Sequence, residues 1–363
     1  MDRGTMRAAV RRGTQLIVTD VPDVRPEQGQ VVARTLACGI CGSDLHAVHH
    51  LEHGVEIGRR SGAPDTIDPA QDLVLGHEFC AEILDHGPGT DKRLKPGTRV
   101  VSTPFAFGPG GPELIGFSTR FSGALAERVA LTEALLLPVP NGLPSEIAAL
   151  TEPLAVGTHA VAVANPGSRS VAMVIGCGPI GLAVIVALKR RGIGPVIAAD
   201  FSPARRALAE QMGAHIVVDP ATASAHNHWE VLDVPATLAS LGHAQLQGRS
   251  VRDAVVFECV GVPGMLQNLL ENAPPLSHIV VVGACMEDDR IVPVIGINKQ
   301  MRFSFVWAYS PDEFADTLHA LGEGLIDGSA FLTDRVSLAE TAAAFDRLAA
   351  PGDQVKIVVE PWR

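Results

Sequence analysis

Short apolar segments alternate with segments of helical character from Val171 onward, and this alternation restricts the possible folds most. The apolar segments read SVAMVIG, GPVIAAD, HIVVD, DAVVFECVG and HIVVVGA, and helical stretches such as PIGLAVIVALKRRG lie between several of them. The pattern is typical of a doubly wound α/β domain, a parallel sheet with helices on both faces. The uncharged run from Val171 to Leu188 approaches the length of a membrane helix, but its glycines and proline divide it into strand, turn and helix. We therefore expect no membrane span.

The segments before Val171 predict a different architecture. MRAAVRR, QLIVTD, QVVARTLA, FCAEILDHG and GTRVVST are short β-like runs separated by Gly and Pro, as in a compact, mostly β domain. After about Tyr309 the sequence predicts one or two helices and a final strand, QVKIVVE, which we expect to return to the first domain. A chain of 363 residues is long enough for two domains. We predict a β-rich domain over 1–154 and 310–363, and a nucleotide-binding domain over 155–309.

Composition disfavours several kinds of partner and location. The formal net charge of −11 argues against nucleic acid and anionic membranes as partners. Only one close pair, Cys38 and Cys41, exists among the six cysteines, so a secreted disulfide framework is not expected. The N-terminal residues lack the apolar core of a signal peptide, and we expect a cytoplasmic protein.

A glycine-rich turn joins the first strand of the alternating region to its helix. VIGCGPIG places Gly176, Gly178 and Gly181 in a GxGxxG pattern, and Asp200 closes the next strand about 20 residues further on. Such glycines allow a tight turn, close approach of a pyrophosphate and helix–strand packing, while the helix N-terminus favours the phosphates. Asp200 would bind the adenosine ribose and repel a 2′-phosphate, which favours NAD over NADP. The alternative is a glycine turn of an unrelated α/β protein, with Asp200 merely initiating a helix.

The segment ACGICGSDLH presents a second chemical signal. A zinc ribbon needs a second CxxC or a histidine pair at matching spacing, which the chain lacks, and a redox CxxC would normally begin a helix of a thioredoxin-like unit. The remaining possibility is a catalytic metal site with three protein ligands and one open position. His77, Glu78 and Glu152 are the candidates for further ligands.

The ordered motifs CGICGSDLH, GHE, TEPLAVG, GCGPIG, the acidic Asp200 and ECVGVPG together resemble the zinc-dependent medium-chain dehydrogenase/reductase family. The resemblance covers nearly the whole chain and lies with the polyol, butanediol and threonine dehydrogenase-like branch of this alcohol dehydrogenase superfamily. It implies a GroES-like catalytic domain joined to a Rossmann domain, with the active site in the cleft between them.

The resemblance also implies a ligand set for one zinc ion. It makes Cys41 and His77 ligands and leaves Cys38 as a small filler. Glu152 falls where family members place a third ligand or a residue bonded to the zinc water. Glu78 is a ligand in some members and lies behind the ligands in others, so the choice between the two glutamates stays open.

Further roles follow from the same resemblance. Ser43 and His46 match positions that pass a proton from the alcohol to solvent, and Asp44 would steady a ligating imidazole. Asp200 and Arg205 match the adenosine-ribose site. The remaining cofactor-binding positions are the turn residues Gly176, Gly178, Pro179, Ile180 and Gly181 and the walls of the nicotinamide pocket, Val260, Val282 and Gly283.

Two segments depart from the family pattern. Many relatives hold a second, structural zinc with four closely spaced cysteines, but the corresponding stretch, 102–121, has none, so we expect one zinc per chain. The segment between His46 and His77 is longer than usual and carries His49, His50 and His53. It is either a second metal site or substrate lid, or a polar surface turn, and the sequence favours the turn.

These inferences predict a zinc-dependent oxidoreductase acting on CH–OH donors, which transfers a hydride between a secondary alcohol or polyol and NAD. The substrate's hydroxyl proton would leave through Ser43, the cofactor ribose and His46. The alternatives are a zinc-free quinone or enoyl reductase of the same fold and a non-enzymatic nucleotide-binding protein. MRFSFVWA, Met301 to Ala308, reads as an exposed last strand of the sheet, and with the resemblance it predicts a homodimer or homotetramer.

Overall fold

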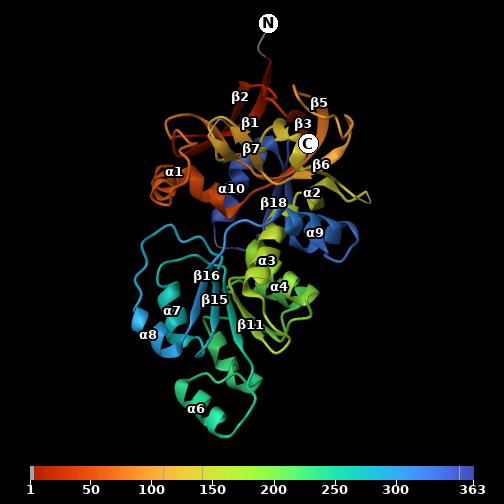
Figure 1. Cartoon of the computed structure of the whole chain (residues 1–363). Coiled ribbons are helices and arrows are strands. Elements are labelled where there is room, and N and C mark those ends of the chain that lie inside the picture. The colour runs from red at the N-terminus through yellow and green to blue at the C-terminus, as the bar shows by residue number, and fades with distance from the viewer. Residues whose placement is uncertain (1–3, 109, 141, 351) are drawn as a thin grey trace. The chain divides into compact units, whose positions relative to one another are not determined.

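The computed structural model describes residues 4–108, 110–140, 142–350 and 352–363. The chain divides into two compact units. Met1–Glu152 and Phe314–Arg363 form the β-rich unit, and Pro153–Glu313 form the parallel-sheet unit (Figure 1). The sequence predicted the boundaries at 154/155 and 309/310, close to these divisions.

The β-rich unit is built on a sheet of order β10-β6-β5-β3-β18-β17, with β9 also paired to β3. These strands are β3 (Gln30–Gly39), β5 (Glu78–His86), β6 (Arg99–Ser102), β9 (Arg128–Thr132), β10 (Leu136–Pro138), β17 (Leu332–Ser337) and β18 (Lys356–Glu360). A smaller sheet has the order β2-β1-β4, and β7 pairs with β8 as a hairpin. The strands of these two groups are β1 (Thr5–Arg12), β2 (Gln15–Pro22), β4 (Leu73–Val74), β7 (Phe105–Gly108) and β8 (Gly111–Leu114).

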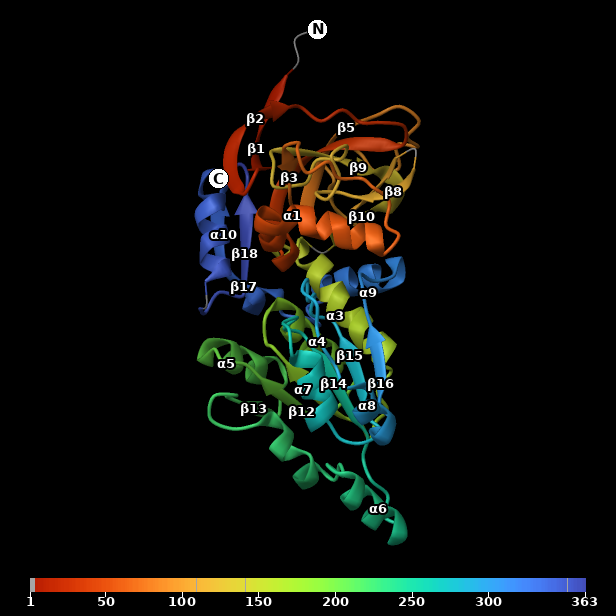
Figure 2. The same cartoon turned by 90° about the vertical axis from the view of Figure 1, so that its left-hand side faces the viewer.

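The central strand β3 brings distant parts of the chain together. Gly39 pairs with Glu78 on β5, and Cys38 pairs with Val359 on β18. Figure 2 labels the three strands β3, β5 and β18 in this unit. The expected return of the final strand to the first domain is therefore confirmed. Because β3 contacts both neighbours at its end, the segment beginning at Cys41 emerges beside the start of β5.

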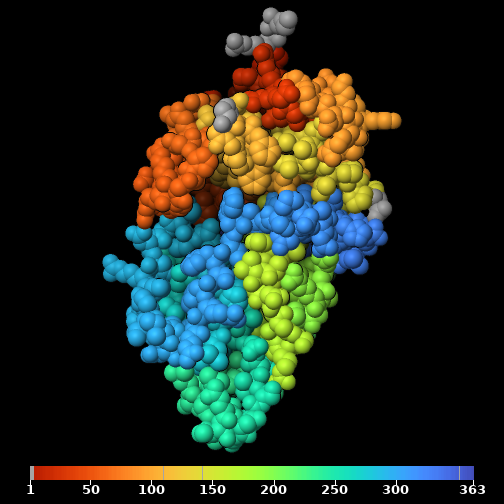
Figure 3. All heavy atoms as spheres, viewed as in Figure 1, coloured from red at the N-terminus to blue at the C-terminus, as the bar shows by residue number. Residues whose placement is uncertain are grey.

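Helices complete this unit. They are α1 (Gly42–Arg60), α2 (Ser145–Ala148), most of α9 (Pro311–Gly322), α10 (Thr341–Ala349) and the 3-10 helices η1 (Glu133–Leu135), η4 (Gly328–Phe331) and η5 (Leu338–Glu340). The prediction of a polar surface turn around the histidines is wrong, because His46, His49, His50 and His53 all lie in α1. The helix kinks at His50, and Figure 3 shows α1 at the surface of its unit.

The parallel-sheet unit contains six strands in the order β13-β12-β11-β14-β15-β16, and every neighbouring pair is parallel. The strands are β11 (Val171–Ile175), β12 (Val196–Ala199), β13 (Ile216–Val218), β14 (Ala254–Glu258), β15 (His278–Val281) and β16 (Arg302–Phe305). This is the doubly wound dinucleotide-binding order, in which the direction of winding reverses between β11 and β14. The predicted fold class is confirmed.

Its helices are α3 (Thr151–Ala164), α4 (Pro179–Arg190), α5 (Pro203–Met212), α6 (Leu238–Leu246), α7 (Met265–Asn272), α8 (Pro293–Lys299), η2 (Ala225–His228) and η3 (Glu230–Leu232). The apolar run from Val171 divides into β11 and α4, as predicted. The segment 226–250, which the sequence pattern did not allow us to place, contributes to η2, η3 and α6, and the buried Trp229 lies between η2 and η3.

One segment, Ser145–Ala164, is long and apolar enough to cross a membrane by composition. In the structure, 72% of the apolar 18-residue stretch within this segment is buried. Such burial is typical of a core helix of a folded protein. The uncharged run from Val171 to Leu188, which the sequence analysis compared with a membrane helix, is a different segment and forms β11 and α4.

Candidate metal centre and cofactor site

Three side chains of metal-binding type converge in the β-rich unit. Ligand atoms of Cys41, His77 and Glu78 all lie within 4.8 Å of one another. Cys41 is the residue before α1, while His77 and Glu78 lie where the chain enters β5. The pairing of β3 with β5 therefore assembles the cluster.

Asp44 connects the two segments that carry the cluster. Its carboxylate is fully buried and accepts N–H bonds from Cys41 at 2.9 Å and from Gly76 at 3.3 Å. Oδ1 of Asp44 also lies 3.5 Å from Nδ1 of His77. Burial alone would lower the pKa of His77, but the charge of Asp44 and then Cys41 outweigh it and raise that pKa well above its usual value. A metal ion would bind the neutral form of this imidazole.

Glu78 forms a buried ion pair that the sequence analysis missed. Both carboxylate oxygens lie 2.7 Å from Nζ of Lys356, which also donates to the Ile40 carbonyl at 2.9 Å. The side chains are 0% and 2% exposed. Burial would lower the pKa of Lys356, but Glu78 raises it above the usual value. The lysine that begins the apolar strand KIVVE could have indicated a buried charge in the sequence. Its partner lies 278 residues away and was not predictable from spacing.

Phe117 is a second residue that the sequence did not single out. Its ring meets the His77 ring edge to face, with centroids 5.5 Å apart. It belongs to the cysteine-free stretch 102–121. Within that stretch, the hydroxyl of Ser118 donates to Glu113 at 2.6 Å and accepts the N–H groups of Arg120 and Phe121. Turn hydrogen bonds thus hold the lobe that presents Phe117.

Cys38 lies outside the cluster. It is fully buried on β3, and its thiol donates to the Gly39 carbonyl at 3.5 Å. Burial, followed by the charge of Asp44, raises the pKa of Cys38 well above its usual value. A thiol that resists ionisation is a poor metal ligand.

Within the part of the chain that the structure describes, the cluster does not include the other expected residues Glu152, Ser43 and His46. Glu152 is half-buried at the start of α3 and, after Glu78, contributes to the raised pKa of Lys356. Ser43 and His46 occupy exposed positions in the first turns of α1. Partial burial and then the charge of His50 lower the pKa of His46.

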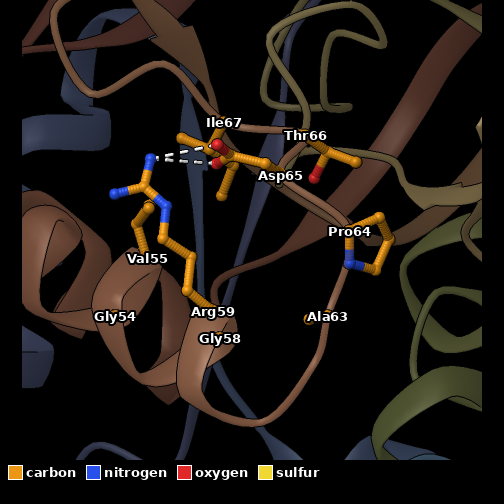
Figure 4. Close-up of a pocket in the computed structure, with 9 residues that line it drawn as sticks. All are labelled: Gly54, Val55, Gly58, Arg59, Ala63, Pro64, Asp65, Thr66 and Ile67. Carbon is orange, nitrogen blue, oxygen red and sulfur yellow. Dashed lines mark hydrogen bonds and ion pairs between the residues drawn. The ribbon is translucent and has the colours of Figure 1, made fainter.

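A separate pocket of about 130 Å³ lies between the second half of α1 and residues 63–67 (Figure 4). Arg59 and Asp65 bridge it with an ion pair at 3.1 Å. None of its lining residues belongs to the cluster of Cys41, His77 and Glu78.

The glycine-rich turn of the parallel-sheet unit has the geometry of a phosphate-binding loop. Gly176 has a φ of +88°, and a side chain at Gly181 would collide with the Gly176 carbonyl. Gly178 precedes α4, which begins with Pro179 and Ile180. The N-terminal N–H groups of α4 therefore remain available to an anion.

Asp200 closes β12 beside this turn. Its carboxylate accepts N–H bonds from Cys177 at 2.7 Å and from Ser202 at 2.8 Å. Arg205 donates its backbone N–H to the Ser202 hydroxyl at the start of α5. Arg206, which the sequence analysis did not include, donates to the Asp200 carbonyl at 2.8 Å. Val260 follows β14, and Val282 and Gly283 follow β15, at the same edge of the sheet.

Comparison with known proteins relates these sites to a family. Residues 27–141 match the alcohol dehydrogenase GroES-like domain, and residues 179–323 match the zinc-binding dehydrogenase domain. The chain is 32% identical to (R,R)-butanediol dehydrogenase of Bacillus subtilis over 353 residues, which cover 95% of this chain and 96% of that protein. The chain belongs to the zinc-type medium-chain dehydrogenase family.

Other relatives agree with this assignment. This chain is 28% identical to sorbitol dehydrogenase of Bacillus subtilis, over 99% of this chain and 98% of that protein. The crystal structure of 2R,3R-butanediol dehydrogenase from Bacillus subtilis aligns with a TM-score of 0.77 at 29% identity, covering 98% and 99% of the two chains. A zinc-binding dehydrogenase of Sinorhizobium meliloti bound to NADP shares the fold, with a TM-score of 0.80 at 24% identity over 99% of this chain and 100% of that chain. The predicted family and its GroES-like and Rossmann domains are confirmed, and the protein is an oxidoreductase of this family.

The donor set of the cluster fits zinc. Thiolate, imidazole and carboxylate are its usual ligands, at bond lengths of about 2.0–2.3 Å. The three donor atoms lie within 4.8 Å of one another, and donors around one tetrahedral zinc lie roughly 3.3–3.8 Å apart, so modest side-chain adjustments would bring all three to one ion.

We predict that Cys41→Ser loses zinc and that Cys38→Ser keeps it. A neutral hydroxyl replaces thiolate poorly, and loss of a direct ligand should lower turnover by more than the roughly 100-fold that supporting residues cost. Zinc content by elemental analysis and turnover of both variants measure this. Similar zinc losses in the two variants would show that Cys41 is not the ligand.

Proposed function

We propose that the dehydrogenase interconverts a secondary alcohol or polyol and its carbonyl compound, with NAD as hydride carrier and a single zinc ion per chain. The observation that carries this proposal is the convergence of Cys41, His77 and Glu78, a zinc-type donor set, in a chain of this family. Relatives named butanediol and sorbitol dehydrogenases support diols and polyols as the first substrates to test. A cytoplasmic protein without nucleic-acid or membrane partners accords with the net charge of −11.

In this proposal the residues of the β-rich unit hold the metal and move the proton. A zinc ion at this position supplies Lewis acidity toward the substrate oxygen. Asp44 orients His77 and supports its basicity. Ser43 receives the proton of the substrate hydroxyl, and His46 passes it to solvent. The lowered pKa of His46 keeps its imidazole neutral, and so able to accept a proton, at lower pH than a free histidine.

The residues of the parallel-sheet unit bind the dinucleotide. The turn Gly176–Gly181 and the start of α4 receive the pyrophosphate, and Asp200 and Arg205 receive the adenosine ribose. Val260, Val282 and Gly283 form the wall of the nicotinamide pocket, where the ring acts as hydride carrier.

A substrate screen tests the proposal. NADH absorbance is followed with 2,3-diols, polyols, threonine and simple secondary alcohols, on enzyme of known zinc content. Turnover should disappear when a chelator removes zinc and return when zinc is restored. Full activity of zinc-free enzyme would instead favour a zinc-free quinone or enoyl reductase. NADH binding without turnover of any substrate would favour a non-enzymatic nucleotide-binding protein.

Glu78 and Glu152 are alternative carboxylate ligands for the metal in this proposal. A site of Zn²⁺, thiolate, neutral imidazole and one carboxylate has no net charge, and a second bound carboxylate would occupy the open position and weaken the Lewis acid. Lys356 already pairs with both oxygens of Glu78. We therefore propose that one glutamate at a time holds the metal, and that Glu152 exchanges with Glu78 as substrate enters.

Glu152→Ala is then expected to lower turnover far more than zinc content, because Glu78 remains as a ligand. Glu78→Ala leaves Lys356 buried and unpaired and should reduce the free energy of unfolding by about 3–5 kcal/mol. The double variant Glu78→Ala, Lys356→Met removes that unpaired charge and is the matched control for stability. Zinc stoichiometry, turnover and urea unfolding are measured on each. Complete loss of zinc from Glu152→Ala would make Glu152 a fixed ligand and end the exchange proposal.

Asp200 should determine the choice between NAD and NADP. Its carboxylate would repel a 2′-phosphate, so wild-type enzyme is expected to prefer NAD. Asp200→Gly should weaken NAD binding and move the NADP-to-NAD ratio of kcat/KM toward NADP by about tenfold or more, the factor given by 1.4 kcal/mol. Asp200→Asn removes the charge but keeps one acceptor oxygen, so it retains a hydrogen bond from either Cys177 or Ser202, which donate to different oxygens of the carboxylate. A wild-type preference for NADP would contradict this role.

The exposed edge of the parallel sheet supports self-association. β16 is paired on one side, to β15, and the exposed fractions of Phe305 and Trp307 are 71% and 75%. We propose that two chains pair through this edge, to give a dimer or a tetramer. Light scattering at working concentration should give a mass of at least two chains, and the mass of one chain would contradict the proposal.

A further inference from the structure

Glu258, the last residue of β14, connects the two loops that end β14 and β15. The residue is 1% exposed. Oε1 accepts the N–H groups of Val260 at 2.7 Å and Gly261 at 2.8 Å. The backbone carbonyl of Glu258 accepts the N–H groups of Val282 and Gly283, both at 2.9 Å. One residue therefore provides hydrogen-bond acceptors to four N–H groups in two loops.

The loops are packed too closely for side chains at their glycines. Gly261 has a φ of +71°, and a Cβ there would lie 2.7 Å from the backbone nitrogen of Ala284. A Cβ on Gly283 would touch the nitrogen of Gly261 and lie 2.7 Å from Oε2 of Glu258. The Glu258 carboxylate thus occupies the space between the two loops. Gly261 and Gly283 leave this space free because they have no side chain.

The buried carboxylate is balanced by backbone groups. The side chain of Glu258 accepts its hydrogen bonds from backbone N–H groups. No lysine, arginine or histidine of the described residues forms an ion pair with it. A buried charge is costly unless its hydrogen bonds are made, and bonds to a carboxylate are stronger than neutral ones. The conformation of the loop after β14 and the hydrogen bonding of the Glu258 side chain therefore depend on each other.

A dinucleotide bound across the sheet would place one of its halves over these loops. In a doubly wound sheet the ligand binds at the carboxyl ends of the strands, where the winding reverses, here between β11 and β14. Asp200 at the end of β12 marks the adenosine side. The loops after β14 and β15 are on the other side, where Val260 is 42% exposed and offers an apolar surface to a ring.

We propose that Glu258 is a positioning residue for the nicotinamide half of the cofactor. It holds Val260, Val282 and Gly283 in the arrangement that accepts the ring, while the adenosine half depends on Asp200 and the glycine turn. This inference rests on the proposed binding of NAD and adds a residue that does not itself touch the ring.

The nicotinamide and adenosine halves of the cofactor site can be tested separately by comparing the binding of NADH with that of ADP-ribose, which lacks the nicotinamide. Calorimetric titrations of the zinc-loaded enzyme compare wild type, Glu258→Leu and Glu258→Gln. Leucine removes the acceptor, so the Kd for NADH should rise by about tenfold or more, while the Kd for ADP-ribose stays unchanged within error. Glutamine keeps one acceptor oxygen for the N–H groups of Val260 and Gly261 and should recover most of the NADH affinity. Glu271→Gln, on the exposed surface of the same unit, is the control for lost charge.

The two ligands also distinguish the possible failures. Unchanged NADH binding in Glu258→Leu, or parallel loss of both ligands, would overturn the positioning role. If the leucine variant does not fold, Glu258→Asp replaces it: its shorter side chain keeps the charge but withdraws the acceptor, so the same selective loss of NADH is expected. Wild-type enzyme that binds neither ligand would refute the proposed dinucleotide site itself.

Discussion

The buried ion pair between Lys356 and Glu78 is the contact on which the β-rich unit depends. Neither charge is tolerable in the interior without the other, because removing ions from water is costly unless they are paired and hydrogen-bonded. Lys356 comes from β18, the last strand of the chain, and Glu78 opens β5. The metal-binding segments are thus completed only when the end of the chain returns and inserts between β3 and β17.

Local patterns predicted the parallel-sheet unit well. The alternation of strands and helices, the glycine turn and Asp200 are features of consecutive residues, and their spacing follows from the geometry of one strand–turn–helix unit. The return of the final strand was also predicted, because an isolated strand after a helix needs a partner. In the β-rich unit the motif residues Cys41, His77 and Glu78 converge because β3 pairs with β5, a register that the sequence did not specify.

The remaining features depend on contacts between distant segments. Lys356, Phe117 and Glu258 acquire their surroundings from strand pairing and loop packing, so spacing in the sequence carries no signal for them. The histidine-rich run of α1 was predicted as a surface turn because its histidines offer no clear ligand geometry, although its buried apolar residues Ala47, Val48, Leu51 and Val55 have helical spacing. Its start, however, had a readable sign: Asp44, three residues after Cys41, caps the helix N-terminus.

The position of Asp44 bears on how the enzyme meets its metal. Because its carboxylate bonds to the N–H groups of both Cys41 and Gly76, the two segments that carry the cluster are joined by the protein itself. Hydrogen bonds of the protein thus link these segments, whereas in a zinc finger the ion itself creates the fold. The frame of the metal site is consequently a property of the fold, and an ion adds chemistry to segments that are already held together.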